Sequence, residues 1–137
     1  MKDEIKEQDP FVEPQKTNQQ KRNLKKRLKE YALRIIRLYE SFPKHGAVHV
    51  VSHQLLRSGT SPGAQYYEAR RAKSDADFIS KIEGALQELE ESGYWIELLI
   101  DGKFVIESKL KPLYDETQEL IKILVTTVVK TKARKKG

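Results

Sequence analysis

The apolar residues that follow Leu24 repeat with alternating steps of four and three, and this pattern constrains the fold more than any other feature. They are Leu24, Leu28, Tyr31, Ile35, Leu38 and Phe42. Such steps place side chains on one face of an α-helix, as in the buried seam of a helical bundle. The pattern predicts a helix that starts near Thr17 or Asn18, which are good N-cap residues. It should end before Pro43, because the residue ahead of a proline disfavours the helical conformation.

Three further segments have apolar spacing that predicts helices. The second segment starts after Gly46, the third opens at Ser74 and ends near Gly102, and the fourth follows Ser108. Ser74 and Asp77 form a capping-box-like pair at the start of the third segment. The apolar positions are Val48, Val51, Leu55, Pro62, Tyr66 and Ala69 in the second, Phe78, Ile82, Ala85, Leu89, Ile96 and Leu99 in the third, and Leu110, Leu113, Leu120, Leu124 and Val128 in the fourth. The sequence therefore predicts an all-α fold, an antiparallel up-down four-helix bundle with short loops.

The length of 137 residues fits one domain. We expect a flexible acidic leader over residues 1–20, the four-helix bundle over residues 21–132 and a basic C-terminal tail over residues 133–137. The chain has no cysteine, which excludes disulfides, thiolate zinc sites and thiol nucleophiles. It also lacks the apolar core of a signal peptide and any apolar run of about 18 residues, so we expect a cytoplasmic protein without membrane contact.

The stretch "SGTSPG", residues 58–63, interrupts the second predicted helix. It lacks the lysine of a phosphate-binding loop and the third glycine of a dinucleotide motif, so a nucleotide site is disfavoured. One alternative is a turn, with Ser61 as the cap and Pro62 at the first position of a new helix. The other is a continuous helix kinked near Pro62, in which Gly59 and Gly63 share a face and allow a neighbouring helix to approach closely. The residues alone leave these two alternatives open.

The run "QLLRSGTSPGAQYYEARRAKSDADFISKIEGALQELEESGYWIELL", residues 54–99, resembles the core pattern of the 23S rRNA intervening-sequence proteins. The flanking "YALRIIRLYESFP" and "LKPLYDETQELIKILVTTV" resemble the first and last helices of that family, so the resemblance covers residues 23–132. It implies a compact up-down bundle, assembly into ring-like homopentamers, and a glycine stretch that is a tightly packed part of a long second helix. The family usually has asparagine where this chain has Gln65.

Charged residues in the second and third helices match charged positions of the family pattern, and we expect them to form interhelical ion pairs. They are Arg57, Glu68, Arg71, Asp77, Lys81, Glu88 and Glu91. Ion pairs of this kind specify helix register more than they add stability.

The net charge of +6 arises mainly in the first helix and at the C-terminus. The basic residues there are Arg22, Lys25, Lys26, Arg27, Lys29, Arg34, Lys130, Lys132, Arg134, Lys135 and Lys136. An up-down bundle with four helices places the start of the first and the end of the fourth at one pole, where these residues can bind phosphates. The sequence thus predicts a protein that binds RNA or DNA non-specifically. The alternative is a protein-interaction scaffold with no nucleic-acid role.

Two segments, "YALRIIRLY" and "GYWIELLI", are more apolar than one buried stripe requires, which predicts a homo-oligomer. Catalysis is not expected, because no nucleophile, metal constellation or acid–base pair stands out. His45, His49 and His53 are four residues apart, but no HExxH pattern accompanies them. Glutamates 83, 90 and 97 lack the Glu-x-x-His motif of di-iron bundles. We therefore predict a non-enzymatic protein with no metal site and no cofactor.

Overall fold

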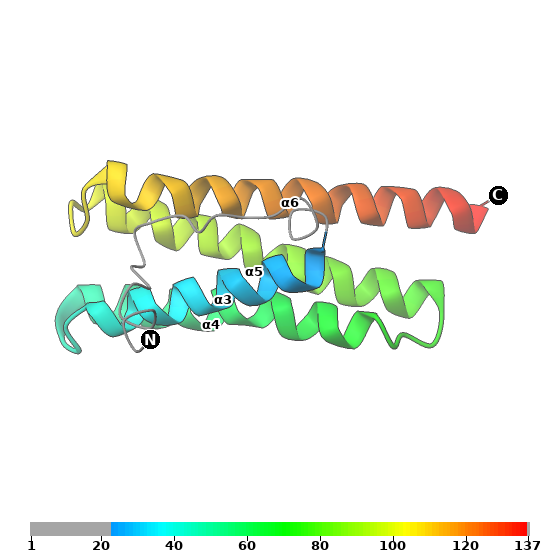
Figure 1. The fold of residues 1–137 in the computed structure, drawn as a ribbon, viewed down its shortest axis with the longest axis horizontal. Helices are drawn as coiled ribbons and strands as arrows, with labels where there is room; N and C mark the ends of the chain where they lie inside the picture. The colour runs from blue at the N-terminus through cyan, green and yellow to red at the C-terminus, as the bar shows by residue number, and fades with distance from the viewer. Residues whose placement is uncertain (1–22, 137) are drawn as a thin grey trace, which may run out of the picture.

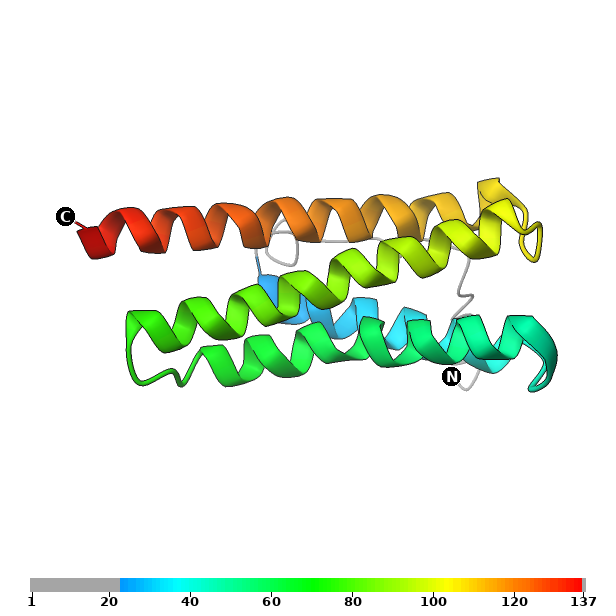
Figure 2. The same cartoon turned by 180° about the vertical axis from the view of Figure 1, so that it is seen from behind.

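The computed structural model describes residues 23–136, which form four helices connected by short loops (Figure 1). The helices are α3 (Leu24–Ser41), α4 (Gly46–Ala69), α5 (Asp75–Asp101) and α6 (Glu107–Lys136). They run alternately up and down, and α5 lies between α4 and α6, as the view from behind also shows (Figure 2). α3 packs mainly on α4 and meets α6 over a short stretch only. The predicted all-α four-helix bundle is confirmed.

The ends of the first and last helices differ from the prediction. α3 begins at Leu24, and the Asn23 side chain caps it by accepting a hydrogen bond from the backbone N–H of Lys26 at 3.1 Å. The predicted start at Thr17 or Asn18 is wrong, because the polar residues just before Asn23 have no apolar side chain to bury on the seam, and packing supplies most helix stability. α6 continues to Lys136, through most of the stretch expected to be a separate tail. The predicted leader lies outside the described residues.

α4 is one continuous helix with Pro62 inside it, so the turn alternative for the glycine stretch is excluded. A Cβ atom built on Gly59 would lie 2.7 Å from Cγ1 of Ile35, and one built on Gly63 would lie 3.6 Å from the carbonyl oxygen of Leu28. Both glycines therefore face α3. The predicted close approach of a neighbouring helix is confirmed, and the neighbour is α3.

A layer of buried hydroxyl groups joins all four helices at mid-height. The Tyr31 hydroxyl of α3 lies 2.6 Å from the Thr117 hydroxyl of α6, and the Ser58 hydroxyl of α4 lies 2.8 Å from the Ser92 hydroxyl of α5. All four residues are almost fully buried. Buried hydroxyls are costly unless they are hydrogen-bonded, so this layer favours the one helix register that pairs them.

Burial raises the pKa of Tyr31 to about 12, even though hydrogen bonds to Thr117 and Ser92 act in the opposite direction. A pKa above its unfolded value of about 10 means that the protonated hydroxyl contributes stability below pH 10, and this contribution is lost as the pH rises toward 12. We expect the free energy of unfolding of the native protein to fall by about 2 kcal/mol relative to Tyr31→Phe between pH 9 and pH 11.5. Urea denaturation at fixed protein concentration measures this difference. A difference between the two proteins that does not change over that pH range would contradict it.

Within residues 23–136, no helix combines the length and the apolar character that crossing a membrane requires.

Candidate functional site

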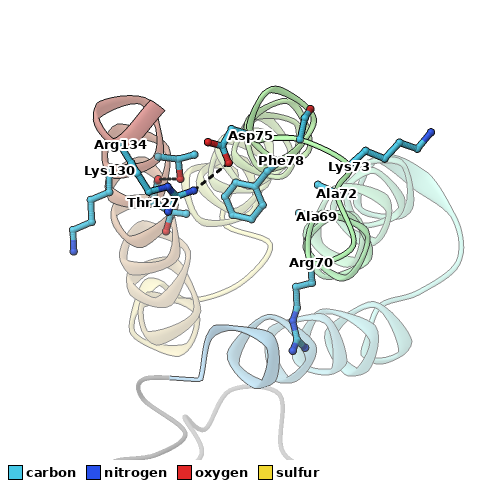
Figure 3. A pocket seen from close by; sticks show the side chains of 11 residues that line it. Ala69, Arg70, Ala72, Lys73, Asp75, Phe78, Thr127, Lys130 and Arg134 are labelled. Carbon is cyan, nitrogen blue, oxygen red and sulfur yellow. Dashed lines mark hydrogen bonds and ion pairs between the residues drawn. The ribbon is translucent and has the colours of Figure 1, made fainter. Parts of the chain in front are cut away.

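A groove opens at the pole where α4 ends, α5 begins and α6 ends. It has a volume of about 590 Å³, and we call it the pole groove (Figure 3). Its lining includes Ala69, Arg70, Ala72, Lys73, Asp75, Phe78, Thr127, Lys130 and Arg134. The ring of Phe78 points into the opening, Arg134 reaches across to Asp75 at 3.2 Å, and Lys130 and Lys73 point outward on its two sides (Figure 3). The groove therefore has an apolar patch around Phe78, the threonine residues Thr127 and Thr131 on its α6 side, and a basic rim.

The local sequence explains where α5 starts beside this groove. The Ser74 side chain accepts a hydrogen bond from the backbone N–H of Asp77 at 3.1 Å, and the Asp77 carboxylate accepts one from the backbone N–H of Lys73 at 3.2 Å. These two bonds form the predicted capping-box-like pair. They hold the short α4–α5 connection, which lines one side of the groove.

The groove exists because α3 is shorter than the other helices. Arg27, in the first turn of α3, lies beside Glu116, and Thr131 of the groove follows Glu116 by 15 residues on α6. At a rise of about 1.5 Å per residue, Thr131 lies about 20 Å past the start of α3, and α6 continues beyond it. Figure 1 shows this overhang. The basic residues at the start of α3 and those at the end of α6 are thus separated along the molecule, and the structure does not bring them together.

Two of the predicted nucleic-acid contacts are buried. Arg27 is 8% exposed and Arg34 is 3% exposed. The guanidinium of Arg27 donates to both carboxylate oxygens of Glu116, at 2.8 and 3.2 Å. A helix that packs on two sides buries residues flanking its apolar seam, and both arginines take part in the bundle for this reason. Buried side chains of this kind do not contribute to a phosphate-binding surface.

The other predicted basic residues are placed as follows. Lys25, Lys26 and Lys29 are exposed on the first turns of α3, and Nζ of Lys25 lies 5.5 Å from the ring centre of Tyr67. On α6, Lys130 is exposed and Lys132 is ion-paired with Glu83 at 3.3 Å. Arg22 lies outside the residues that the structure describes, as do the side chains of Lys135 and Lys136.

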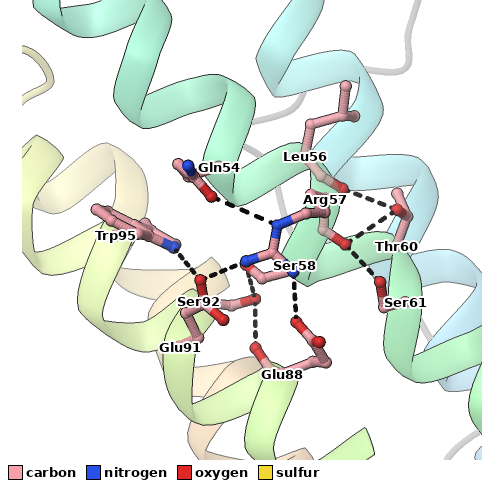
Figure 4. Close-up of polar contacts among 10 residues, drawn as sticks. All are labelled: Gln54, Leu56, Arg57, Ser58, Thr60, Ser61, Glu88, Glu91, Ser92 and Trp95. Carbon is pink, nitrogen blue, oxygen red and sulfur yellow. Dashed lines mark hydrogen bonds and ion pairs between the residues drawn. The ribbon is translucent and has the colours of Figure 1, made fainter.

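The charged residues between α4 and α5 gather around Arg57 (Figure 4). Its guanidinium donates to Glu88 at 3.1 Å and also to Glu91, which in turn accepts a hydrogen bond from the Trp95 indole at 3.2 Å. The buried pair of Ser58 and Ser92 lies next to this cluster. Because the Arg57 side chain is 46% exposed, the ion pairs add little stability, and their main effect is on how α4 and α5 align.

The remaining residues expected in interhelical ion pairs are placed differently. Lys81 pairs with Asp77 at 3.7 Å, but both belong to α5. The guanidinium of Arg71 lies over the ring of Tyr67, 5.9 Å from its centre. Glu68 is exposed on the last turns of α4.

The histidines and the spaced glutamates do not converge on one point. His49 and His53 lie beside Tyr39, with ring centres 6.1 and 6.3 Å from it. Glu97 accepts a hydrogen bond from the Tyr114 hydroxyl at 2.9 Å, and this bond raises the pKa of Tyr114. Across residues 23–136, no three histidine, aspartate or glutamate side chains are close enough together to hold a metal ion.

The buried polar residues of α5 and α6 were not among the predicted ones. Their signal is a gap in the apolar spacing: Leu89 and Ile96 are seven residues apart, with Ser92 between them. Leu113 and Leu120 are also seven apart, and Glu116 and Thr117 fill that gap. A position that the period assigns to the core but that has a polar side chain indicates a buried polar contact.

A family model described as 23S rRNA-intervening sequence protein matches residues 20–126. A similar solved structure is the crystal structure of a protein with unknown function from the S23 ribosomal protein family of Bacteroides thetaiotaomicron. It is 37% identical, the match covers 77% of this chain and 97% of that chain, and the TM-score is 0.71. No curated protein matches the sequence.

Proposed function

Because the chain belongs to the family of 23S rRNA-intervening sequence proteins, as its sequence pattern predicted, we propose that it is a non-enzymatic, cytoplasmic protein that binds RNA or DNA non-specifically. The observation that supports this proposal best is the basic rim of the pole groove. Arg70, Lys73, Lys130 and Arg134 surround it, and Asp75 is the only carboxylate among the residues that line it. Cations grouped in this way attract phosphates whatever the base sequence.

The ion pairs at this pole do not block phosphate contacts. Lys132 pairs with Glu83 and Arg134 pairs with Asp75, and in both pairs the two side chains are roughly half exposed. Exposed pairs of this kind contribute about 0–1 kcal/mol. A phosphate that approaches the pole can therefore replace the carboxylate at small cost.

Self-association would multiply this surface. Large apolar side chains are exposed on all four helices. They are Leu33 and Ile36 on α3, Val50 and Tyr67 on α4, Tyr94 on α5, and Val125 and Val129 on α6. Apolar side chains spread along a bundle favour contact with further copies. We propose a homopentamer, in line with the assembly that the family resemblance implies. A ring would present several basic poles to one nucleic acid.

Charge reversal at the pole tests the proposal. We expect Lys130→Glu combined with Lys132→Glu to weaken binding of a fluorescent single-stranded RNA by about 10-fold or more at 50 mM salt, because two phosphate contacts become repulsive. The matched control is Lys109→Glu combined with Lys111→Glu, which changes the net charge equally at the opposite end of α6. Fluorescence anisotropy gives both affinities. Equal losses in the two variants would show that only total charge matters.

The scaffold alternative is favoured by a different surface. Phe104 is 47% exposed and Ile106 is 67% exposed, and both lie in the α5–α6 connection at the far pole. Exposed apolar side chains on a loop are common in protein-binding surfaces. If the native protein shows no RNA or DNA binding even at 50 mM salt, the nucleic-acid proposal fails and the scaffold function is supported.

A further inference from the structure

The pole groove lies open beside the N-terminal end of α3. The first turn of α3 is level with Gly63 of α4 and Glu116 of α6, since Gly63 faces the Leu28 carbonyl and Arg27 pairs with Glu116. Ala69 of the groove lies six residues beyond Gly63, which is about 9 Å along a helix. Because α3 runs away from this pole, its N-terminal end faces the groove. Among the described residues, those that line the groove come from α4, the α4–α5 connection, α5 and α6, and none comes from α3.

The lining of the groove favours a ligand that has both acidic and apolar side chains. Phe78 points into the opening, and Ala69 and Ala72 line its α4 side. Four basic side chains against Asp75 leave the lining with a charge of about +3. An apolar surface with a cationic rim binds a segment that presents carboxylates around a few apolar side chains.

Residues 1–14, "MKDEIKEQDPFVEP", have this composition. They contain five carboxylates and two lysines, a side-chain charge of −3, and they include Ile5, Phe11 and Val12. The charge is opposite to that of the groove, and the aromatic and aliphatic side chains suit the surface around Phe78. Residues 15–22 contain three basic side chains and no acidic one, so the acidic character ends at Pro14.

We propose that residues 1–14 bind in the pole groove of their own chain. The carboxylates are matched by Arg70, Lys73 and Lys130, and the apolar side chains by Phe78. The reach is sufficient, because residues 15–22 in extended form span about 26 Å, at about 3.3 Å per residue. This length exceeds the offset of the groove from the start of α3, which is about 9 Å along α4 and about 20 Å along α6. A tethered segment has an effective concentration in the millimolar range, so even weak contacts are occupied. If the proposed function holds, bound nucleic acid and residues 1–14 compete for the same cations, and the segment lowers affinity for polyanions.

Disulfide trapping tests the docking directly, because the natural chain has no cysteine. Gln8→Cys is combined with Ala72→Cys in the groove, or with Ser108→Cys at the far pole as the matched control. In a glutathione buffer at low salt, we expect an intramolecular disulfide to form at least 10-fold faster with Ala72→Cys than with Ser108→Cys. Mass spectrometry of a mixture of isotopically light and heavy protein distinguishes disulfides within one chain from disulfides between two chains. Equal rates for the two pairs, or links only between chains, would overturn the proposal.

A charge-neutral variant separates docking from nucleic-acid binding. Replacing the five acidic residues of this segment by amides, with Asn for Asp3 and Asp9 and with Gln for the three glutamates, should remove the rate advantage of the Ala72→Cys pair. It should also raise RNA affinity several-fold. Selective trapping in a protein that binds no RNA would support docking and refute the proposed function. RNA binding without selective trapping would refute docking alone.

Discussion

Replacing Glu116 by leucine is expected to lower the free energy of unfolding by about 3–5 kcal/mol, the usual cost of breaking a buried ion pair from one side. Glu116 is 6% exposed and Arg27 is 8% exposed, and the guanidinium makes two hydrogen bonds to the carboxylate. After the substitution, the buried guanidinium keeps its charge and loses this carboxylate. The pair also joins α3 to α6 where these two helices have few other contacts.

Two control variants test whether the loss of stability comes from the buried pair. Glu119→Leu makes the same change at an exposed position one turn along α6 and should alter stability by less than about 0.5 kcal/mol. The double variant Arg27→Met with Glu116→Leu should recover most of the loss, because apolar side chains of similar volume can replace a buried pair. Guanidinium denaturation at one protein concentration measures all three. Equal effects of Glu116→Leu and Glu119→Leu would show that the buried pair does not stabilise the bundle.

Gly59→Val is expected to lower the free energy of unfolding by about 3 kcal/mol through overpacking between α3 and α4. A Cβ atom at residue 59 would lie 2.7, 3.0 and 3.1 Å from three carbon atoms of Ile35. Ile35 is 1% exposed, so its side chain has no free space into which to turn. α3 and α4 would therefore have to move apart.

Gly63 provides the matched control for this prediction. Gly63 lies one turn further along α4, and its added Cβ would make only an ordinary contact of 3.6 Å with the Leu28 carbonyl. Gly63→Ala should therefore leave the packing intact and raise stability by about 0.5–1 kcal/mol through helix propensity. Gly59→Ala should be destabilising. If both alanine variants shift the thermal midpoint in the same direction, the close approach at Gly59 does not limit the packing.

Much of the fold could be predicted from local patterns. The four-three spacing of Leu28, Tyr31, Ile35 and Leu38 predicts a seam, and all four are buried. The capping pair at Ser74 and Asp77 depends on residues three apart in sequence, so it too could be predicted. The charged residues of the candidate site were harder to place. A lysine or arginine beside a seam can point to solvent or lie under a neighbouring helix, and only the packing of that neighbour distinguishes Arg27 from Lys26.

The four helices of residues 23–136, their apolar faces and the small residues Gly59 and Gly63 could all be predicted from the chain alone, because each follows from the helical period of nearby residues. Tertiary packing was needed to show that Arg27 meets Glu116, that four hydroxyls form one layer, and that α3 stops short and leaves the pole groove open. These features depend on how far each helix extends relative to its neighbours. That offset is the sum of many weak contacts between residues distant in sequence, and no local pattern specifies it.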